Sequence, residues 1–280
     1  MENSSKNNTY YEHKNNSSPH NSSELAVIVC TKNSGSTIKN LLLNIKQSSF
    51  KPDIILVDGF STDDTVKISN NVGGVKIIQQ SFKKFPGKGI AMKTGLIEAI
   101  NGNTNSNDLV NTYKAILFLD ADIKNITPEW VDDLAKPILE GGGFDMTRGF
   151  YQRHPRDAAV TKLIAKPMLR IFFPELSHIE QPLSGEVCSN ISLWKKMLKN
   201  GPPDGWGIDV WFLIEAVVSG SRIKEVYLGN KDHSSFDDYK DDVGILSKMA
   251  EQVSFTIIKE AVKHKRFEIY KDVEIWSKSK

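Results

Sequence analysis

Two acidic residues follow a strongly apolar segment near the middle of the chain. Asp120 and Asp122 come directly after the run 115–119 and are separated by one alanine. On an extended backbone, residues two apart project to the same side, so both carboxylates are expected to face one point. Paired hard oxygen ligands suit Mg²⁺ or Mn²⁺. An Asp-x-Asp pair is common, however, and a solvated acidic turn explains it equally well.

Other polar residues also follow apolar runs in the first half. Asp58 ends the run 54–57 and is suited to hydrogen bonds with a ribose or a base, although a simple turn is the alternative. Lys88 stands between Gly87 and Gly89, where unhindered backbone N–H groups and one ammonium can meet a phosphate. A lysine exposed at the start of a helix is the alternative there.

Three features of the second half are candidates for chemistry. Residues 181–186 (Gln-Pro-Leu-Ser-Gly-Glu) form either a structured active-site loop or a turn. Asp209 stands at the start of an apolar helix, where a carboxylate can contact a ligand or simply favour the helix dipole. His233 follows a strand and is either a metal ligand or a surface histidine.

The apolar segments that position these residues alternate between strand and helix. This alternation predicts a parallel, doubly wound α/β sheet. In such sheets ligands bind at the carboxyl ends of the strands, which is where Asp58, Asp120 and Asp122 stand. The strands are expected at 25–30, 54–57, 75–78 and 115–119, and helices at 38–45, after 61–63, and at 90–100.

The second half continues with mixed elements. We expect helices at 129–139, at 157–172, after Gly207 and at 241–265, and strands at 145–150 and 223–228. Residues 1–23 are mostly Asn, Ser and Lys with almost nothing to bury, so a disordered tail is expected there.

Composition excludes several classes of protein. The formal net charge of the 280 residues is +2, which does not suit a protein that wraps nucleic acid. No run approaches the 18 apolar residues of a membrane span, so no membrane anchor and a cytoplasmic location are expected. Cys30 and Cys188 lie among apolar neighbours and are interpreted as buried thiols.

Taken in order, these motifs resemble the retaining GT-A glycosyltransferases that form glucosyl-3-phosphoglycerate from a nucleotide sugar and 3-phosphoglycerate. The similarity extends over about 25–252. The segments 57–63 and 120–122 are shared with many sugar transferases. More specific are 87–89, Phe150-Tyr151, 165–167, 174–176, 181–186, 205–207, and Leu228-Gly229 with His233.

The resemblance implies a role for each matching position. A divalent metal, Mg²⁺ or Mn²⁺, would be held by Asp122 and His233. Lys88 and Asp209 would act at the reacting centre. The nucleotide-sugar donor would contact Thr31, Asn33, Asp58, Lys88 and Asp120. A small acidic acceptor would contact Arg148, Thr161, Leu183, Ser184, Gly185 and Glu186.

The chain departs from the family at several of these positions. Ala159 stands where the family carries an arginine that grips the acceptor phosphate, and guanidinium forks are well suited to phosphate. Arg148, Arg153 and Arg156 are the nearby candidates to replace it. Ser34 replaces an acidic residue, Ser184 a glycine, and Asp209 a glutamate.

The resemblance also implies an organisation and leaves alternatives open. Residues 24–126 would form the nucleotide-sugar half and 127–265 the acceptor half of one GT-A domain, followed by a C-terminal tail, 266–280. The enzyme would transfer a hexose such as glucose, and a homodimer is possible. An inverting GT-A transferase acting on a polyprenyl phosphate or glycan, and a non-catalytic nucleotide-sugar-binding protein, are the two alternatives.

Overall fold

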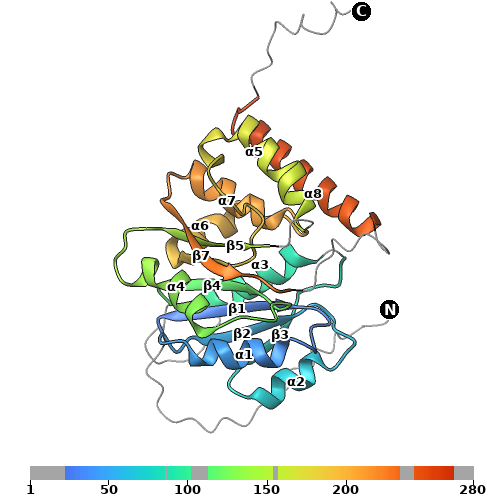
Figure 1. Cartoon of the computed structure of the whole chain (residues 1–280), viewed down its shortest axis with the longest axis vertical. Helices are drawn as coiled ribbons and strands as arrows, with labels where there is room; N and C mark the ends of the chain where they lie inside the picture. The colour runs from blue at the N-terminus through green and yellow to red at the C-terminus, as the bar shows by residue number, and fades with distance from the viewer. Residues whose placement is uncertain (1–22, 86, 102–112, 154–156, 234–242, 268–280) are drawn as a thin grey trace, which may run out of the picture.

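The computed structural model describes residues 23–85, 87–101, 113–153, 157–233 and 243–267 (Figure 1). The tail expected over 1–23, apart from Ser23, lies outside these residues, as do Arg156 and most of the C-terminal tail. No helix in the described ranges has both the length and the hydropathy that crossing a bilayer requires.

A seven-stranded sheet forms the centre of the molecule. Its order is β3-β2-β1-β4-β6-β5-β7, and all pairs are parallel except those that β6 makes with β4 and β5. The predicted mostly parallel sheet is therefore confirmed. The strands are β1 (Leu25–Thr31), β2 (Asp53–Asp58), β3 (Lys76–Gln79), β4 (Ala115–Asp120), β5 (Met146–Gln152), β6 (Val187–Asn190) and β7 (Ile223–Asn230).

Helices cover both faces of this sheet because successive residues of its strands are apolar on both sides. In β1, Leu25, Val27 and Val29 pack with α1 (Ile38–Gln47) and α4 (Pro128–Leu139), while α2 (Thr65–Val72) lies beside α1. Ala26 and Ile28 face the opposite side, where α3 (Lys88–Asn101), α6 (Ile191–Lys199) and α7 (Ile208–Val218) pack.

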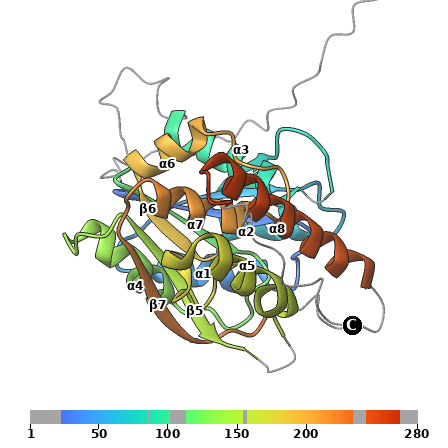
Figure 2. The ribbon, with the colours of Figure 1, turned by 90° about the horizontal axis from the view of Figure 1, so that it is seen from above.

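A further layer of helices covers α7. Residues 208–216 of α7 are all buried, because one side packs on the sheet and the other on α5 (Lys166–Phe172) and α8 (Val243–Lys263). Figures 1 and 2 show α5 and α8 as the outermost helices of this half. A short 3-10 turn, Pro174–Leu176, follows α5.

The second half of the chain differs from the sequence prediction in two respects. The helix predicted at 157–172 begins only at residue 159, and its segment Thr161–Ala165 is a π-helix rather than an α-helix. The strand β6 and the helix α6 were not predicted. Only four residues form β6, and two of them, Ser189 and Asn190, are polar, so the segment is short and has no apolar run such as those of β1, β2 and β4.

The carboxyl ends of the parallel strands meet at one edge. Thr31 of β1 pairs in register with Asp58 of β2, and Cys30 pairs with Asp120 of β4. His233, which follows β7, forms an isolated bridge with Ile123 just beyond β4. Residues far apart in sequence therefore converge at this edge, as the strand-end argument predicts.

Candidate active site

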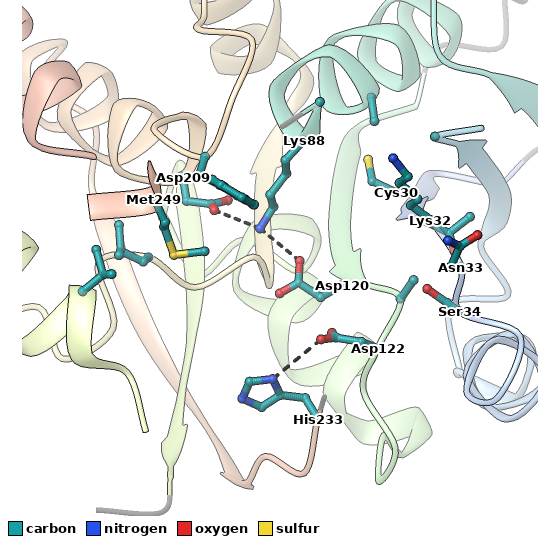
Figure 3. Close-up of a pocket in the computed structure, with 18 of the residues that line it drawn as sticks. Cys30, Lys32, Asn33, Ser34, Lys88, Asp120, Asp122, Asp209, His233 and Met249 are labelled. Atoms are coloured by element: carbon teal, nitrogen blue, oxygen red, sulfur yellow. Dashed lines mark hydrogen bonds and ion pairs between the residues drawn. The ribbon is translucent and has the colours of Figure 1, made fainter. Parts of the chain in front are cut away.

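A cavity of about 430 Å³ opens at the carboxyl edge of the sheet (Figure 3). Its walls come from the loops after β1, β3, β4 and β7, from the starts of α3 and α7, and from α8. Nine of the site residues proposed from the sequence line it, namely Thr31, Asn33, Lys88, Asp120, Asp122, Thr161, Leu183, Asp209 and His233.

Lys88 contacts one carboxylate from each half of the sequence. Its Nζ lies 3.1 Å from Oδ1 of Asp120 and 2.8 Å from Oδ2 of Asp209. Burial alone would lower the pKa of Lys88, but the two carboxylates outweigh it and raise the pKa above its usual range. Lys88 is therefore a fixed cation. Gly89 beside it allows a close approach, because a Cβ there would lie 2.0 Å from the Pro203 carbonyl oxygen.

The two carboxylates bound to Lys88 differ in their electrostatic environment. Burial would raise the pKa of Asp120, yet Lys88 and Lys231 hold it well below its usual range. Burial dominates at Asp209 and raises its pKa despite the contact with Lys88. Oδ1 of Asp209 is buried without a hydrogen-bond partner among the described residues. Since buried polar atoms are normally satisfied, this oxygen is available to a ligand.

Asp122 and His233 face each other at the mouth of the cavity. Nδ1 of His233 lies 3.6 Å from Oδ2 of Asp122, while Nε2 is 3.1 Å from Oδ2 of Asp157. Burial would lower the pKa of His233, but these two carboxylates raise it to about 9. The two carboxylates therefore favour the protonated, cationic form of the His233 imidazole.

The same residues fit a divalent metal ion. Ligand bonds of about 2.1 Å allow one ion to contact two atoms that are 3.6 Å apart. Asp157 on Nε2 would orient the imidazole, as carboxylates behind metal-bound histidines commonly do. Asp157 was not identified from the sequence, because a carboxylate that acts through a histidine has no spacing pattern of its own.

Lys231 is the main residue of the site that sequence reasoning missed. Its side chain is 1% exposed and Nζ lies 3.2 Å from Oδ2 of Asp120 and 2.6 Å from Oε1 of Glu186. Tyr151 adds a hydroxyl at 3.4 Å and its ring face. A lysine beyond a strand is usually solvated, so only its position two residues before His233 could have drawn attention to it.

The loop 181–186 supports the site from behind. A Cβ on Gly185 would lie 2.2–2.5 Å from the Asp120 carboxylate, so only glycine permits this approach. Glu186 is fully buried and accepts hydrogen bonds from Lys231 and from the Ser184 hydroxyl. Leu183 lines the cavity, but Ser184, Gly185 and Glu186 do not. In the structure Gly185 packs against Asp120, and Glu186, which Ser184 contacts, holds Lys231.

Two further residues proposed from the sequence are buried and do not line the cavity. Arg148 is 0% exposed and donates to the carbonyl oxygens of Pro182 and Asp209, both at 2.7 Å, so it does not line the cavity. Asp58 is also buried beside the cavity, where it accepts hydrogen bonds from the Ser61 backbone N–H. Both residues shape the site from outside.

Arg153 is the arginine that does reach the cavity. It lies over the Tyr151 ring, donates to the Tyr151 hydroxyl at 3.0 Å, and has Asp157 at 3.9 Å. Its Nε is buried with no hydrogen-bond partner in the described chain. A guanidinium with an unused donor is suited to an anionic ligand.

Apolar side chains complete the opposite wall. Phe85 and Trp206 meet edge to face, with ring centroids 5.4 Å apart, and Met249 and Val253 of α8 lie beside them. Figure 3 draws Met249 and Asp209 among the residues that line the cavity. These residues were not predicted, because they come from segments that only the fold brings together.

A second group of potential metal ligands lies away from the cavity. Glu215, Glu260 and His264 have ligand atoms within 4.8 Å of one another. The ammonium of Lys263 is 2.5 Å from Oε1 of Glu215 and 2.9 Å from Oε2 of Glu260. Because this ammonium already bridges both carboxylates, we interpret the group as a structural ion-pair cluster between α7 and α8.

Solved structures with the same architecture bind nucleotide sugars. Glucosyl-3-phosphoglycerate synthase from Mycobacterium tuberculosis with Mg²⁺ and UDP has a TM-score of 0.69 and 26% identity, covering 85% of this chain and 79% of that one. The same enzyme with Mn²⁺ and UDP-glucose has a TM-score of 0.70 and 27% identity over 85% and 79%. The chain therefore has the GT-A fold.

Sequence comparisons agree with this likeness. The M. tuberculosis synthase is 28% identical over 231 residues, and the Petrotoga mobilis synthase is 28% identical over 235 residues. These alignments cover 75% and 78% of this chain, but only 66% and 65% of the relatives. The chain thus spans slightly less than two thirds of their length.

A family model describes most of the fold. The model for the glycosyltransferase domain of mannosylglycerate synthase matches residues 54–252, which include Lys88, Asp120, Asp122, Asp209 and His233. The match includes most of the residues that line the cavity, but it begins after the segment 30–34. The chain belongs to this family, that of the mannosylglycerate synthase glycosyltransferase domain.

Proposed function

We propose that this protein is a metal-dependent glycosyltransferase that moves a hexose from a nucleoside-diphosphate sugar to a small acidic acceptor, with retention of configuration. The observation that carries the proposal is the convergence of Asp122 and His233, 3.6 Å apart, on a cavity that also contains Lys88. The solved relatives contain Mg²⁺ or Mn²⁺ with UDP, which supports a divalent metal and a uridine nucleotide.

The donor diphosphate is proposed to lie between the metal ligands and Lys88. When bound to Asp122 and His233, the divalent ion would offset the negative charge of the diphosphate. Lys88 adds a fixed positive charge that needs no reorganisation during the reaction. Lys231 acts indirectly, since its ammonium is enclosed by Asp120, Glu186 and Tyr151.

The nucleoside is proposed to lie over the end of β1. Oγ1 of Thr31 is buried and has no hydrogen-bond partner among the described residues, and Thr31 and Asn33 line the cavity there. Asp120, kept ionised by Lys88 and Lys231, can accept hydrogen bonds from the nucleoside. Asp58 is proposed to hold the segment 58–61 in place by accepting hydrogen bonds from the Ser61 backbone N–H.

Asp209 is proposed to orient the acceptor hydroxyl. Its Oδ2 is engaged by Lys88, while Oδ1 has no partner in the described chain. In a retaining transfer the acceptor oxygen bonds to the anomeric carbon on the face from which the diphosphate leaves. The bond to the diphosphate breaks, and a diphosphate oxygen takes the acceptor proton. Asp209 then needs only to position the hydroxyl, which is consistent with its contact to Lys88.

The acidic part of the acceptor is proposed to meet Arg153. Thr161 and Leu183 line the same cavity, and the unused Nε of Arg153 can donate to a carboxylate or phosphate. A glucosylated 3-phosphoglycerate is the product named for the relatives. One observation favours a second candidate, an unphosphorylated glycerate acceptor: Ala159 provides no guanidinium where the similar enzymes grip phosphate.

A panel of donors and acceptors tests this proposal. UDP-glucose and GDP-mannose would each be incubated with Mn²⁺ and either 3-phosphoglycerate or glycerate, and the products identified by mass and by anomeric configuration. We expect one α-linked hexosyl product from an α-linked donor. A β-linked product would contradict retention, and a protein that binds UDP with Mn²⁺ but transfers no sugar would contradict the enzymatic proposal.

A further inference from the structure

Four lysine side chains of the described chain line the cavity, and three of them form salt bridges. The ammonium groups of Lys84, Lys88 and Lys231 each lie next to at least one carboxylate. Lys32 differs, because no carboxylate of the described residues forms a salt bridge with it. Its ammonium lies 5.3 Å from the centroid of the Phe85 ring instead. A charge that no described acid neutralises is available to an acceptor atom of a ligand.

Many surface lysines are merely solvated, but the backbone on both sides of Lys32 is held at the edge of the cavity. The carbonyl oxygen of Thr31 accepts a hydrogen bond from the Gly59 N–H at 2.7 Å. The N–H of Asn33 donates to the Ser61 hydroxyl at 2.9 Å. The ammonium of Lys32 therefore moves mainly by rotations of its own side chain, and a donor that is already positioned loses less freedom when a ligand binds.

Lys32 lies at the end of the cavity where the nucleoside is proposed to bind. Thr31 precedes it and carries a buried hydroxyl that has no hydrogen-bond partner among the described residues. Figure 3 shows Lys32 and Asn33 well separated from Asp209, which is proposed to lie at the reacting centre. The nucleoside is the part of a nucleotide sugar that lies farthest from the reacting bond. Lys32 is therefore placed to contact the nucleoside rather than the sugar.

An aromatic side chain at the same end offers a surface for a base. Phe85 is 52% exposed and lines the cavity, and Trp206 packs against it edge to face. Stacking on an aromatic ring is open to every base, because every base has a π-face. Phe85 can therefore favour a nucleobase without selecting one. Selection requires a polar group at the edge of the base, and the ammonium of Lys32 lies over this ring.

The chemistry of an ammonium group divides the bases into two classes. An ammonium donates hydrogen bonds and cannot accept them. Uracil and guanine present carbonyl oxygens, O4 and O6, that accept a hydrogen bond, whereas cytosine and adenine present amino groups, which are donors, at the equivalent positions. An amino group opposite the ammonium gains no hydrogen bond, and both donors then lose their water without replacement.

We propose that Lys32 selects a keto base, uracil or guanine, over an amino base, cytosine or adenine, in the nucleotide of the donor. This inference rests on the proposed function, because it requires a nucleotide in the cavity. Lys32 takes no part in the transfer itself. It determines which nucleotide is bound by donating to the carbonyl oxygen of the base.

Isothermal titration calorimetry of the full chain with Mn²⁺ and either UDP or CDP tests the proposal without relying on turnover. The two nucleotides differ only at the edge of the base. We expect UDP to bind roughly 10-fold more tightly than CDP, as the loss of one hydrogen bond to a charged group predicts. Lys32→Met should weaken UDP binding and bring the two affinities close together. Lys32→Arg, which keeps a cationic donor, should retain most of the preference.

Lys83→Met is the matched control. Lys83 is also exposed and its ammonium also lies over a phenylalanine ring, 5.9 Å from the centroid of Phe60, but it does not line the cavity. This variant should keep the wild-type preference for UDP.

Three results would overturn the selection by Lys32 while leaving nucleotide binding in place. They are a wild type that binds UDP and CDP equally, a preference that Lys32→Met leaves unchanged, and an equal weakening of both nucleotides in Lys32→Met. The last result would place the ammonium on the diphosphate. A wild type that binds neither nucleotide would instead contradict the proposed function, and this inference with it.

Discussion

The ammonium of Lys231 lies 2.6 Å from the carboxylate of Glu186, and both side chains are buried at the back of the site. Lys231 also contacts Asp120, which Lys88 holds from the other side. A chain of alternating charges, Glu186, Lys231, Asp120, Lys88 and Asp209, therefore extends across the cavity. This chain fixes the ligand-facing groups before any substrate binds.

Lys231→Met should unfold more easily than the wild type. Removing the ammonium leaves Glu186 buried without a counter-charge, and breaking a buried ion pair in this way typically costs about 3–5 kcal/mol. Urea unfolding followed by circular dichroism measures the loss. Lys231→Arg, which keeps the charge, should retain a larger part of the stability. An unfolding midpoint unchanged in Lys231→Met would show that the pair contributes nothing.

Gly185→Ala should impair turnover more than stability. The added Cβ would come within 2.2–2.5 Å of the Asp120 carboxylate, so the carboxylate or the loop has to move. Displacements of about 1 Å at a reacting centre can cost ~100-fold in rate, and we expect kcat/KM to fall by that order. The comparison is Gly220→Ala, at a φ of +77° with open space around it, which should cost stability but not kcat/KM. Equal kinetic losses in both variants would indicate a general folding defect.

Glu215→Gln should lower the melting temperature at neutral pH and have little effect in acid. Burial would raise the pKa of Glu215, but hydrogen bonds from Lys263, Asn200 and His264 lower it. A depressed carboxylate pKa contributes stability above the unfolded value of about 4.3, and this stability is lost as pH falls through the folded pKa. Melting curves between neutral and acidic pH measure the difference, with exposed Glu140→Gln as the control. A difference that does not depend on pH would contradict the ion-pair interpretation.

The parts of the structure that the sequence predicts are those with a repeating signal. The strands β1, β2 and β4 are continuous apolar or β-branched runs, and their ends necessarily meet at one edge in a parallel sheet. This is why Asp120, Asp122 and Lys88 could be placed in one site. The strand β6 has no such run, since Ser189 and Asn190 make up half of it.

Whether Arg148 and Lys231 belong to the cavity depends on the direction and burial of each side chain, which the sequence pattern does not show. Arg148 lies near the other arginines in sequence, but alternation along β5 places it with Met146 on the face that α7 covers. Lys231 was missed because lysine is ordinarily exposed. Here the carboxylates of Glu186 and Asp120 make its burial possible. Neither partner is adjacent in sequence, so composition and spacing contain no trace of the contact.

The most direct test of the central claim is the binding of Mn²⁺ itself, measured by the loss of the free-ion electron paramagnetic resonance signal in the presence of UDP. The wild type should bind one Mn²⁺ per chain, while Asp122→Ala and His233→Ala should each abolish most of this binding. Asp232→Ala, an exposed neighbour of His233, should behave like the wild type. Undiminished Mn²⁺ binding in both Asp122→Ala and His233→Ala would show that the metal is held elsewhere and would contradict the proposed active site.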